Sequence, residues 1–207
     1  MNLEKSKIVR NVKGNTQPEV RLMSDFHEER IRLVQTGLAI KGAMTALNIT
    51  LSKLAPEIGH SQGYLSRVLA TYCTLDINVC ENIIERFIAA LGKRGATFDE
   101  RKNEIEISFY RPDVAPLGRL YHGAIVGAGC TYSDMAEKLN LSQATLSRVF
   151  NTYAGPEIHV RSDRVVNAVA DALSEKSIEL QIRAKTLHII LNRHAMKFHV
   201  GPPKPTN

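Results

Sequence analysis

The feature that most constrains this chain is an internal repeat, in which residues 51–69 recur as residues 132–150. At a displacement of 81 positions, eight of the nineteen residues are identical, including the run Leu-Ser-Arg-Val that begins at Leu65 and again at Leu146. The match reaches back without a gap to Gly42 over Gly123. A repeat of this kind predicts two copies of one supersecondary unit, so the organisation of the chain follows from it.

Both copies continue into a helical pattern and then into alternating strands. Beyond Tyr153 the displacement becomes 82, because the second copy has one extra residue near Gly155. The apolar residues then repeat at helical spacing and, further on, at every second position. The helical set is Ile83, Ile84, Phe87, Ala90 and Leu91 over Val165, Val166, Val169, Ala172 and Leu173, and the strand set is Ile105, Ile107 and Phe109 over Leu187, Ile189 and Leu191. The chain is therefore expected to be mainly α with β-hairpins, an α+β fold.

The repeat divides the chain into four parts. Residues 1–25 form a basic arm, expected to be partly disordered, and a helix is expected from Phe26 to Leu47. Residues 26–111 and 112–200 hold the two repeats, each ending in a hairpin, with Pro112 and Pro116 breaking regular structure at the joint. Residues 201–207 contain three prolines and are expected to be a loose tail.

The identical segment has the features that two short helices need if they cross through a tight turn. They need a small residue where they touch, a residue tolerant of positive φ in the turn, and a hydroxyl that caps the second helix. These are Ala55, Gly59 and Ser61 in the first copy and Ala136, Asn140 and Ser142 in the second. The residues expected to face the core are Leu54, Ile58, Leu65 and Val68, and Met135, Leu139, Leu146 and Val149. Each copy is thus expected to contain a helix-turn-helix.

The spacing Ala-x3-Gly-x-Ser-x3-Leu-Ser-Arg, which begins at Ala55, resembles the helix-turn-helix of the Cro/repressor class of phage and plasmid regulators. The second copy keeps the spacing with Asn140 at the glycine position. The first copy is also similar to the helix-turn-helix of ParB-type partition proteins. The resemblance covers about twenty residues per copy, and two copies in register make it stronger than either alone.

The resemblance implies that the second helix of each pair enters the major groove of double-stranded DNA. Gln62 and Gln143 have the amide geometry for adenine, and the arginine of each copy can bind guanine or a phosphate. Tyr64 is expected either to reach a phosphate or to pack against the preceding helix. The implied DNA-contacting residues are Ser61, Gln62, Gly63, Tyr64, Ser66 and Arg67 in the first copy and Ser142, Gln143, Ala144, Thr145, Ser147, Arg148 and Asn151 in the second.

The first copy departs from the pattern at three positions. Pro56 falls inside the first helix, His60 stands where the second copy has Leu141, and Gly63 weakens the second helix. The second copy is therefore expected to be the more regular reader.

Charge favours a polyanionic partner, but the two segments supply little of it. The formal net charge is +6, whereas residues 50–70 carry +1 and residues 131–151 carry none. Phosphate contacts dominate the affinity of most DNA-binding proteins. They are therefore expected from basic residues at the two ends of the chain: Lys5, Lys7, Arg10, Lys13 and Arg21, and Arg183, Lys185, Arg193, His194 and Lys197.

The hairpins are expected to serve assembly rather than DNA binding. The first carries Asp99, Glu100, Glu104 and Glu106, which phosphates would repel. The two hairpins could form one sheet within the chain or a sheet shared between two chains. Because exposed apolar strands demand a partner, a homodimer through the hairpin strands is favoured.

Other classes of protein find little support. No HExxH or GxxxxGK[ST] motif is present, and the three cysteines form no CxxC pair, so no catalytic residue, metal or cofactor is expected. The cysteines are expected to be reduced thiols. No apolar run is long enough for a membrane span, and the charged N-terminus does not resemble a signal peptide, which favours a cytoplasmic protein.

The sequence thus favours a sequence-specific transcriptional regulator, a repressor from a plasmid, phage or other mobile element. Two linked readers resemble a covalent version of the usual dimer, with half-sites about 10 bp apart. The alternative is a plasmid partition protein that binds a centromere-like array. The sequence does not specify the target site or any small-molecule inducer.

Overall fold

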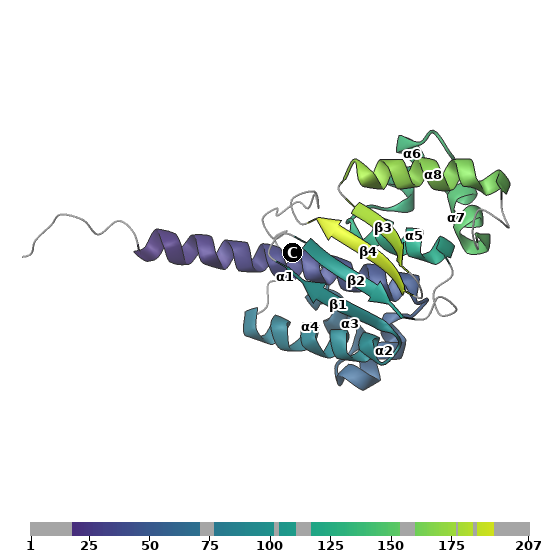
Figure 1. Cartoon of the computed structure of the whole chain (residues 1–207). Coiled ribbons are helices and arrows are strands. Elements are labelled where there is room, and N and C mark those ends of the chain that lie inside the picture. Colours follow the sequence, from purple (N-terminus) through teal and green to yellow (C-terminus); the bar gives the residue numbers. More distant parts are fainter. Residues whose placement is uncertain are drawn as a thin grey trace, which may run out of the picture.

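A computed structural model describes residues 18–70, 77–101, 104–110, 117–153, 160–176, 178–183 and 186–192 (Figure 1). Over these residues the protein has eight helices and a four-stranded antiparallel sheet. The expected class, α+β and mainly helical, is therefore confirmed.

The helices and strands follow the same order in both repeats. The first repeat contains α1 (Pro18–Ala46), α2 (Leu51–Ile58), α3 (Gln62–Val68), α4 (Ile77–Gly92), β1 (Ala96–Glu100) and β2 (Glu104–Phe109). The second contains α5 (Leu117–Gly127), α6 (Tyr132–Lys138), α7 (Gln143–Thr152), α8 (Val160–Ser174), β3 (Ile178–Arg183) and β4 (Thr186–Asn192).

Helix α1 starts earlier than the sequence pattern suggested. It begins at Pro18, a residue well suited to a first helical turn, rather than at Phe26, so part of the expected arm is helical. The expected disorder of the first residues, the proline joint and the loose tail fall on residues 1–17, 111–116 and 193–207, outside the described residues.

The two hairpins join into one sheet within the chain. The strand order is β1-β2-β4-β3, so β2 of the first repeat pairs with β4 of the second. In this pairing Ile107 lies opposite Ile189, and the two are equivalent positions of the repeat. Of the two arrangements left open by the sequence, the intrachain sheet is the one observed. The strands that motivated a homodimer thus pair within the chain, and a homodimer stays a prediction.

Helices α1 and α5 cross in close contact at two equivalent glycines. A Cβ atom on Gly42 would lie 2.6 Å from the carbonyl oxygen of Gly123, and a Cβ atom on Gly123 would lie 2.6 Å from that of Gly42. No other residue fits at such a distance without displacing backbone. The crossing therefore depends on the glycine that both repeats carry.

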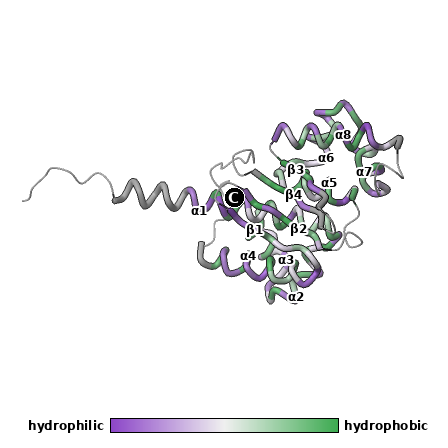
Figure 2. The backbone as a smooth tube through the Cα atoms, in the orientation of Figure 1, coloured by the Kyte–Doolittle hydropathy of each residue, from purple (hydrophilic) through white to green (hydrophobic). Residues whose placement is uncertain are grey.

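The two repeats share one hydrophobic core. Helices α1 and α5 pack on the sheet, with α4 against β1 and α8 against β3 (Figure 1). Ile40 of α1, Ile125 of α5, Ile107 and Ile189 are completely buried in it. Hydrophobic and hydrophilic residues alternate along the elements that border this core (Figure 2). Burial of apolar surface thus holds the repeats together as well as folding each one.

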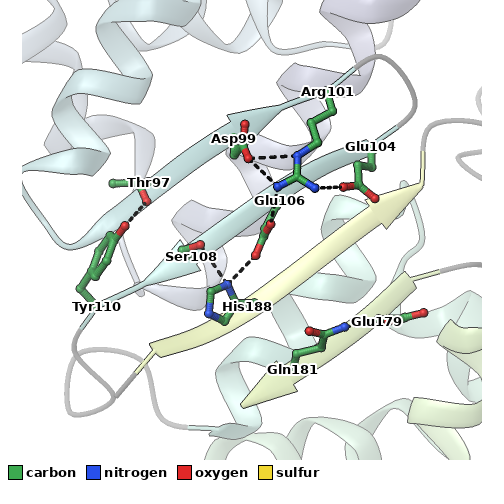
Figure 3. A network of polar contacts seen from close by, with 10 residues as sticks. All are labelled: Thr97, Asp99, Arg101, Glu104, Glu106, Ser108, Tyr110, Glu179, Gln181 and His188. Atoms are coloured by element: carbon green, nitrogen blue, oxygen red, sulfur yellow. Dashed lines mark hydrogen bonds and ion pairs between the residues drawn. The ribbon is translucent and has the colours of Figure 1, made fainter. Parts of the chain in front are cut away.

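The other face of the sheet, here called the outer face, is polar (Figure 3). Arg101 donates hydrogen bonds to Asp99 and Glu104, at 2.8 and 2.7 Å. Glu106 and Ser108 both contact Nδ1 of His188, at 2.7 and 3.0 Å.

The cysteines differ from expectation in one respect. Cys130 is a free thiol, as expected, whereas Cys80 of α4 is disulfide-bonded. The prediction of reduced thiols was therefore wrong for Cys80, since the absence of a CxxC pair does not prevent pairing of cysteines further apart.

Candidate nucleic-acid interface

The first helix pair, residues 50–69, consists of α2, a short turn and α3. Gly59 adopts a left-handed conformation with φ of +81°, which turns the chain away from α2. The side-chain oxygen of Ser61 then accepts a hydrogen bond of 3.3 Å from the backbone N–H of Tyr64. Both roles expected from the sequence are present, because a tight turn needs positive φ and a helix start needs an acceptor.

The second helix pair, residues 131–153, is built on the same plan. Asn140 takes the left-handed conformation with φ of +52°, at the position of Gly59. Ser142 caps α7 by accepting a 3.0 Å hydrogen bond from the N–H of Thr145. Asparagine is among the few residues other than glycine that tolerate this backbone conformation at low cost.

A reciprocal cap stabilises the start of α6. The N–H of Thr131 donates to the Asp134 carboxylate at 2.8 Å, and the N–H of Asp134 donates to the Thr131 hydroxyl at 3.1 Å. The backbone hydrogen bond from Thr131 lowers the pKa of Asp134. The equivalent Thr50 makes no such cap, and its hydroxyl contacts Ser52 instead.

The buried side of each pair matches the apolar pattern of the sequence. Leu54, Leu65 and Leu146 are fully buried, and the alanines at the helix contacts, Ala55 and Ala136, are also buried. Of the expected core residues, Leu139 alone is only half-buried, where it ends α6. The burial of these residues orients the remaining positions of α3 and α7 toward solvent.

On α3 the residues named as candidate DNA contacts form one exposed side. Ser61, Gln62, Gly63, Ser66 and Arg67 are exposed. Tyr64 is half-buried, packed against the core and 5.9 Å below the guanidinium of Arg67. The packing alternative for Tyr64 is therefore observed.

On α7 the candidate residues divide in the same way. Ser142, Gln143, Ala144, Arg148 and Asn151 are exposed, whereas Thr145 and Ser147 are half-buried. The Ser142 and Thr145 hydroxyls lie 2.8 Å apart, and the Asn151 amide donates to Ser147 at 3.4 Å. These contacts preorganise the polar side of the helix.

The structure shows the surroundings of the three residues at which the first copy departs from the helix-turn-helix pattern. Pro56 lies inside α2 beyond its first turn, so it removes a helical hydrogen bond. His60 is half-buried and packs on Tyr64 with ring centres 4.9 Å apart. Gly63 is open, because a Cβ atom there would meet no atom within 4 Å. No steric reason therefore requires glycine at this position.

Sequence reasoning missed an aromatic cluster that supports α7. Phe150 stacks between Tyr121 of α5 and Tyr132 of α6, each at 5.9 Å between ring centres. The hydroxyl of Tyr153 donates to Asp163 of α8 at 3.0 Å. Burial, followed by that hydrogen bond, raises the pKa of Tyr153 to about 12. These residues lie far apart in sequence, so no local pattern could have grouped them.

Charged side chains beside the first helix pair form ion pairs with one another. Glu57 of α2 pairs with Lys93 and Arg94 at the end of α4, at 3.0 and 2.8 Å. The hydrogen bonds from Arg94 and Lys93 lower the pKa of Glu57. The basic ends expected to bind phosphate fall almost entirely outside the described residues, as do the side chains of Arg21 and Arg183.

The described residues contain no group of histidine, cysteine, aspartate and glutamate side chains that could hold a metal ion. No helix among them is long and apolar enough to cross a membrane. Comparison of the chain with protein-family models, with curated proteins and with solved structures gives no match.

Proposed function

We propose that this protein is a sequence-specific, double-stranded-DNA-binding transcriptional regulator in which α3 and α7 read the major groove. The observation that carries the proposal is that two equivalent helices present the same four exposed or half-exposed polar residues on a rigid, capped support. These are Ser61, Gln62, Ser66 and Arg67 on α3 and Ser142, Gln143, Ser147 and Arg148 on α7.

The chemistry of these residues suits base and phosphate recognition. Glutamine can make a paired hydrogen bond to adenine, and arginine to guanine, whereas serine hydroxyls bind phosphate. A solvent-facing glutamine or arginine is ordinary on one helix. Its recurrence at the same place on two capped helices favours a binding role.

Repression is the mode of regulation we propose. A body with two linked readers would cover a short operator and exclude polymerase from an overlapping promoter. We propose a mobile element such as a plasmid or phage as the source of the gene, on the resemblance to phage and plasmid regulators.

The test is selection of bound DNA from a random duplex pool by the full chain, followed by titration at several salt concentrations. The double variant Arg67→Ala with Arg148→Ala should lower affinity for the selected site at least about 10-fold, since each contact to a base contributes about 1–3 kcal/mol. The matched control is Arg101→Ala with Arg164→Ala, which removes two exposed arginines, one from each repeat and outside both helix pairs. An equal loss in both variants, or no selected sequence, contradicts the proposal.

Footprinting on natural DNA separates regulation from partition. One short protected site beside a promoter supports a regulator. Protection of many iterated sites would assign the same DNA-binding surface to a partition protein instead.

A further inference from the structure

We propose that a single chain binds an imperfect inverted repeat, with two half-sites that face each other across a central dyad. This inference rests on the proposed function and specifies the DNA that the two helix pairs take. A tandem repeat in sequence is equally compatible with two readers in head-to-tail order, which would select a direct repeat. The contacts between the repeats decide between these arrangements.

Two separate contacts define a twofold relation within the chain. Gly42 of α1 meets its equivalent Gly123 of α5, and each would place a Cβ at the same 2.6 Å from the carbonyl oxygen of the other. In the sheet, Ile107 of β2 pairs with its equivalent Ile189 of antiparallel β4. Contact of an element with its own equivalent is the mark of an isologous, twofold interface, and a head-to-tail arrangement does not produce it.

The twofold axis passes through both contacts and therefore stands across the sheet. Antiparallel neighbours that pair at equivalent residues are related by an axis perpendicular to the sheet, and α1 and α5 cross on one side of it. The two helix pairs, attached to α1 and α5 at equivalent positions, are consequently related by rotation. The symmetry of a DNA site matches the symmetry of the protein that binds it. Two helix pairs related by a twofold rotation therefore bind half-sites of opposite orientation.

Charge indicates which side of the molecule faces the duplex. The axis leaves the protein through the outer face of the sheet on one side and past α1 and α5 on the other. Among the side chains that the structure describes, the outer face carries Asp99, Glu104, Glu106 and Glu179, against Arg101 and His188 (Figure 3). Phosphates are repelled by such a face, so the DNA lies on the side of α1 and α5.

Contacts at the same axis explain why one chain, rather than two, supplies both halves of the twofold unit. Glu106 and His188 are equivalent positions of the two repeats, and their side chains meet across the axis at 2.7 Å, each about nine-tenths buried. Two identical copies would place glutamate against glutamate there, which is unfavourable for buried carboxylates. The first repeat is therefore complementary to the second rather than to itself, and the dyad is internal to one chain.

The half-sites should agree at some bases and differ at others. The serine, glutamine and arginine positions of α3 and α7 are identical, so the bases that they contact should recur in both halves. Gly63 and Tyr64 of α3 correspond to Ala144 and Thr145 of α7, so the bases next to them should differ. An alanine or threonine methyl suits the thymine methyl group, which glycine cannot contact.

The experiment is the selection of bound DNA described above, in which the relative orientation of the two half-sites is determined from the selected sequences. Native mass spectrometry of the complex then gives the number of chains per duplex. We expect two half-sites in inverted orientation, related by an imperfect dyad, with one chain per duplex. A direct repeat, a single half-site, or two chains per inverted repeat overturns this inference while leaving DNA recognition intact. Failure to select any sequence instead overturns the proposed function, so the two failures are distinguishable.

A variant of α3 tests whether Gly63 and Tyr64 cause the base differences between the two half-sites. Gly63→Ala with Tyr64→Thr gives α3 the residues of α7 at these two positions, and selection should then yield a more symmetric site. Gly63→Ala alone is the matched control, because it leaves Tyr64 and its contacts with His60 in place. Circular dichroism checks that the double variant folds. An unchanged, asymmetric site with a folded variant contradicts this assignment, and the orientation in the parent chain tests the dyad independently.

Discussion

The two helix pairs have the same plan but are stabilised differently. The second has a reciprocal cap at the start of α6, a second helix (α7) of 10 residues and an aromatic cluster around Phe150. In the first, Thr50 makes no side-chain cap at the start of α2, a proline lies inside α2, and the second helix (α3) has 7 residues. Where the second has Phe150, the first has Leu69, and Ile40 and Leu51 stand at the positions of Tyr121 and Tyr132.

The first pair compensates through contacts from α4. Arg86 donates a 3.2 Å hydrogen bond to the carbonyl oxygen of Ile58 at the end of α2, and Glu57 is held by Lys93 and Arg94. Such exposed ion pairs contribute little to the free energy of unfolding, and salt weakens them further. Salt has much less effect on helix caps and on buried rings. The same pair of helices is therefore stabilised in two different ways, and the second pair should be the more rigid.

The largest expected difference concerns the equivalent glycines at the start of each repeat. A Cβ atom on Gly118 would lie 2.1 Å from the carbonyl oxygen of Phe150, whereas a Cβ on Gly37 would lie 3.6 Å from Leu69, an ordinary contact. Gly118→Ala should therefore lower the free energy of unfolding by about 3 kcal/mol or more, as severe overpacking does. Gly37→Ala should be neutral or stabilising, by up to about 1 kcal/mol. Urea denaturation measures both, and equal effects contradict the difference in packing.

The caps provide the next comparison. Thr131→Ala removes the hydrogen bond that the Thr131 hydroxyl accepts from the N–H of Asp134 at the start of α6 and should cost about 1 kcal/mol. Thr50→Ala, at the equivalent position, should cost much less because Thr50 makes no cap. Thermal unfolding of the two variants checks this order. A larger loss for Thr50→Ala would show that the first pair depends on a cap after all.

Gly63→Ala tests whether the first pair is limited by its own helix. The added Cβ meets no atom within 4 Å, so the substitution should stabilise the protein by about 1 kcal/mol through helix propensity alone. Chemical denaturation measures the gain, with Ser66→Ala as a control at an exposed position without glycine. Destabilisation would indicate that the glycine has a role in the fold that its open surroundings do not reveal.

The smallest expected effect is a pH dependence confined to the second pair. His122 stacks on Tyr132 with ring centres 4.1 Å apart, and burial lowers the pKa of His122. The unfolded chain then binds the proton more readily, so stability should fall as pH decreases below about 6.5, the pKa of a free histidine. His122→Phe keeps a ring against Tyr132 and should reduce the difference in unfolding free energy between pH 7.5 and 5.5. If this difference is the same in the variant, other groups cause the pH dependence of stability.

Much of the local structure was predictable because it depends on neighbouring residues. The repeat, the positive φ at Gly59 and Asn140, and the serine caps follow from backbone preferences that act within a few positions. The exposed side of α3 and α7 follows from apolar spacing, since burial of one side of a helix leaves the other in solvent. The ring cluster around Phe150 was not predictable, because it depends on how α5, α6 and α7 meet.

By itself, then, the sequence determined two equivalent pairs of short helices, each followed by a further helix and a hairpin. It did not determine whether the hairpins join within one chain or between two. Only the tertiary structure decided that, through the pairing of Ile107 with Ile189 and the crossing of Gly42 with Gly123. The physical reason is that strand pairing and helix crossing are contacts between segments some eighty residues apart. A periodic pattern shows that such segments need partners, but shape and charge across the interface select which partner they take.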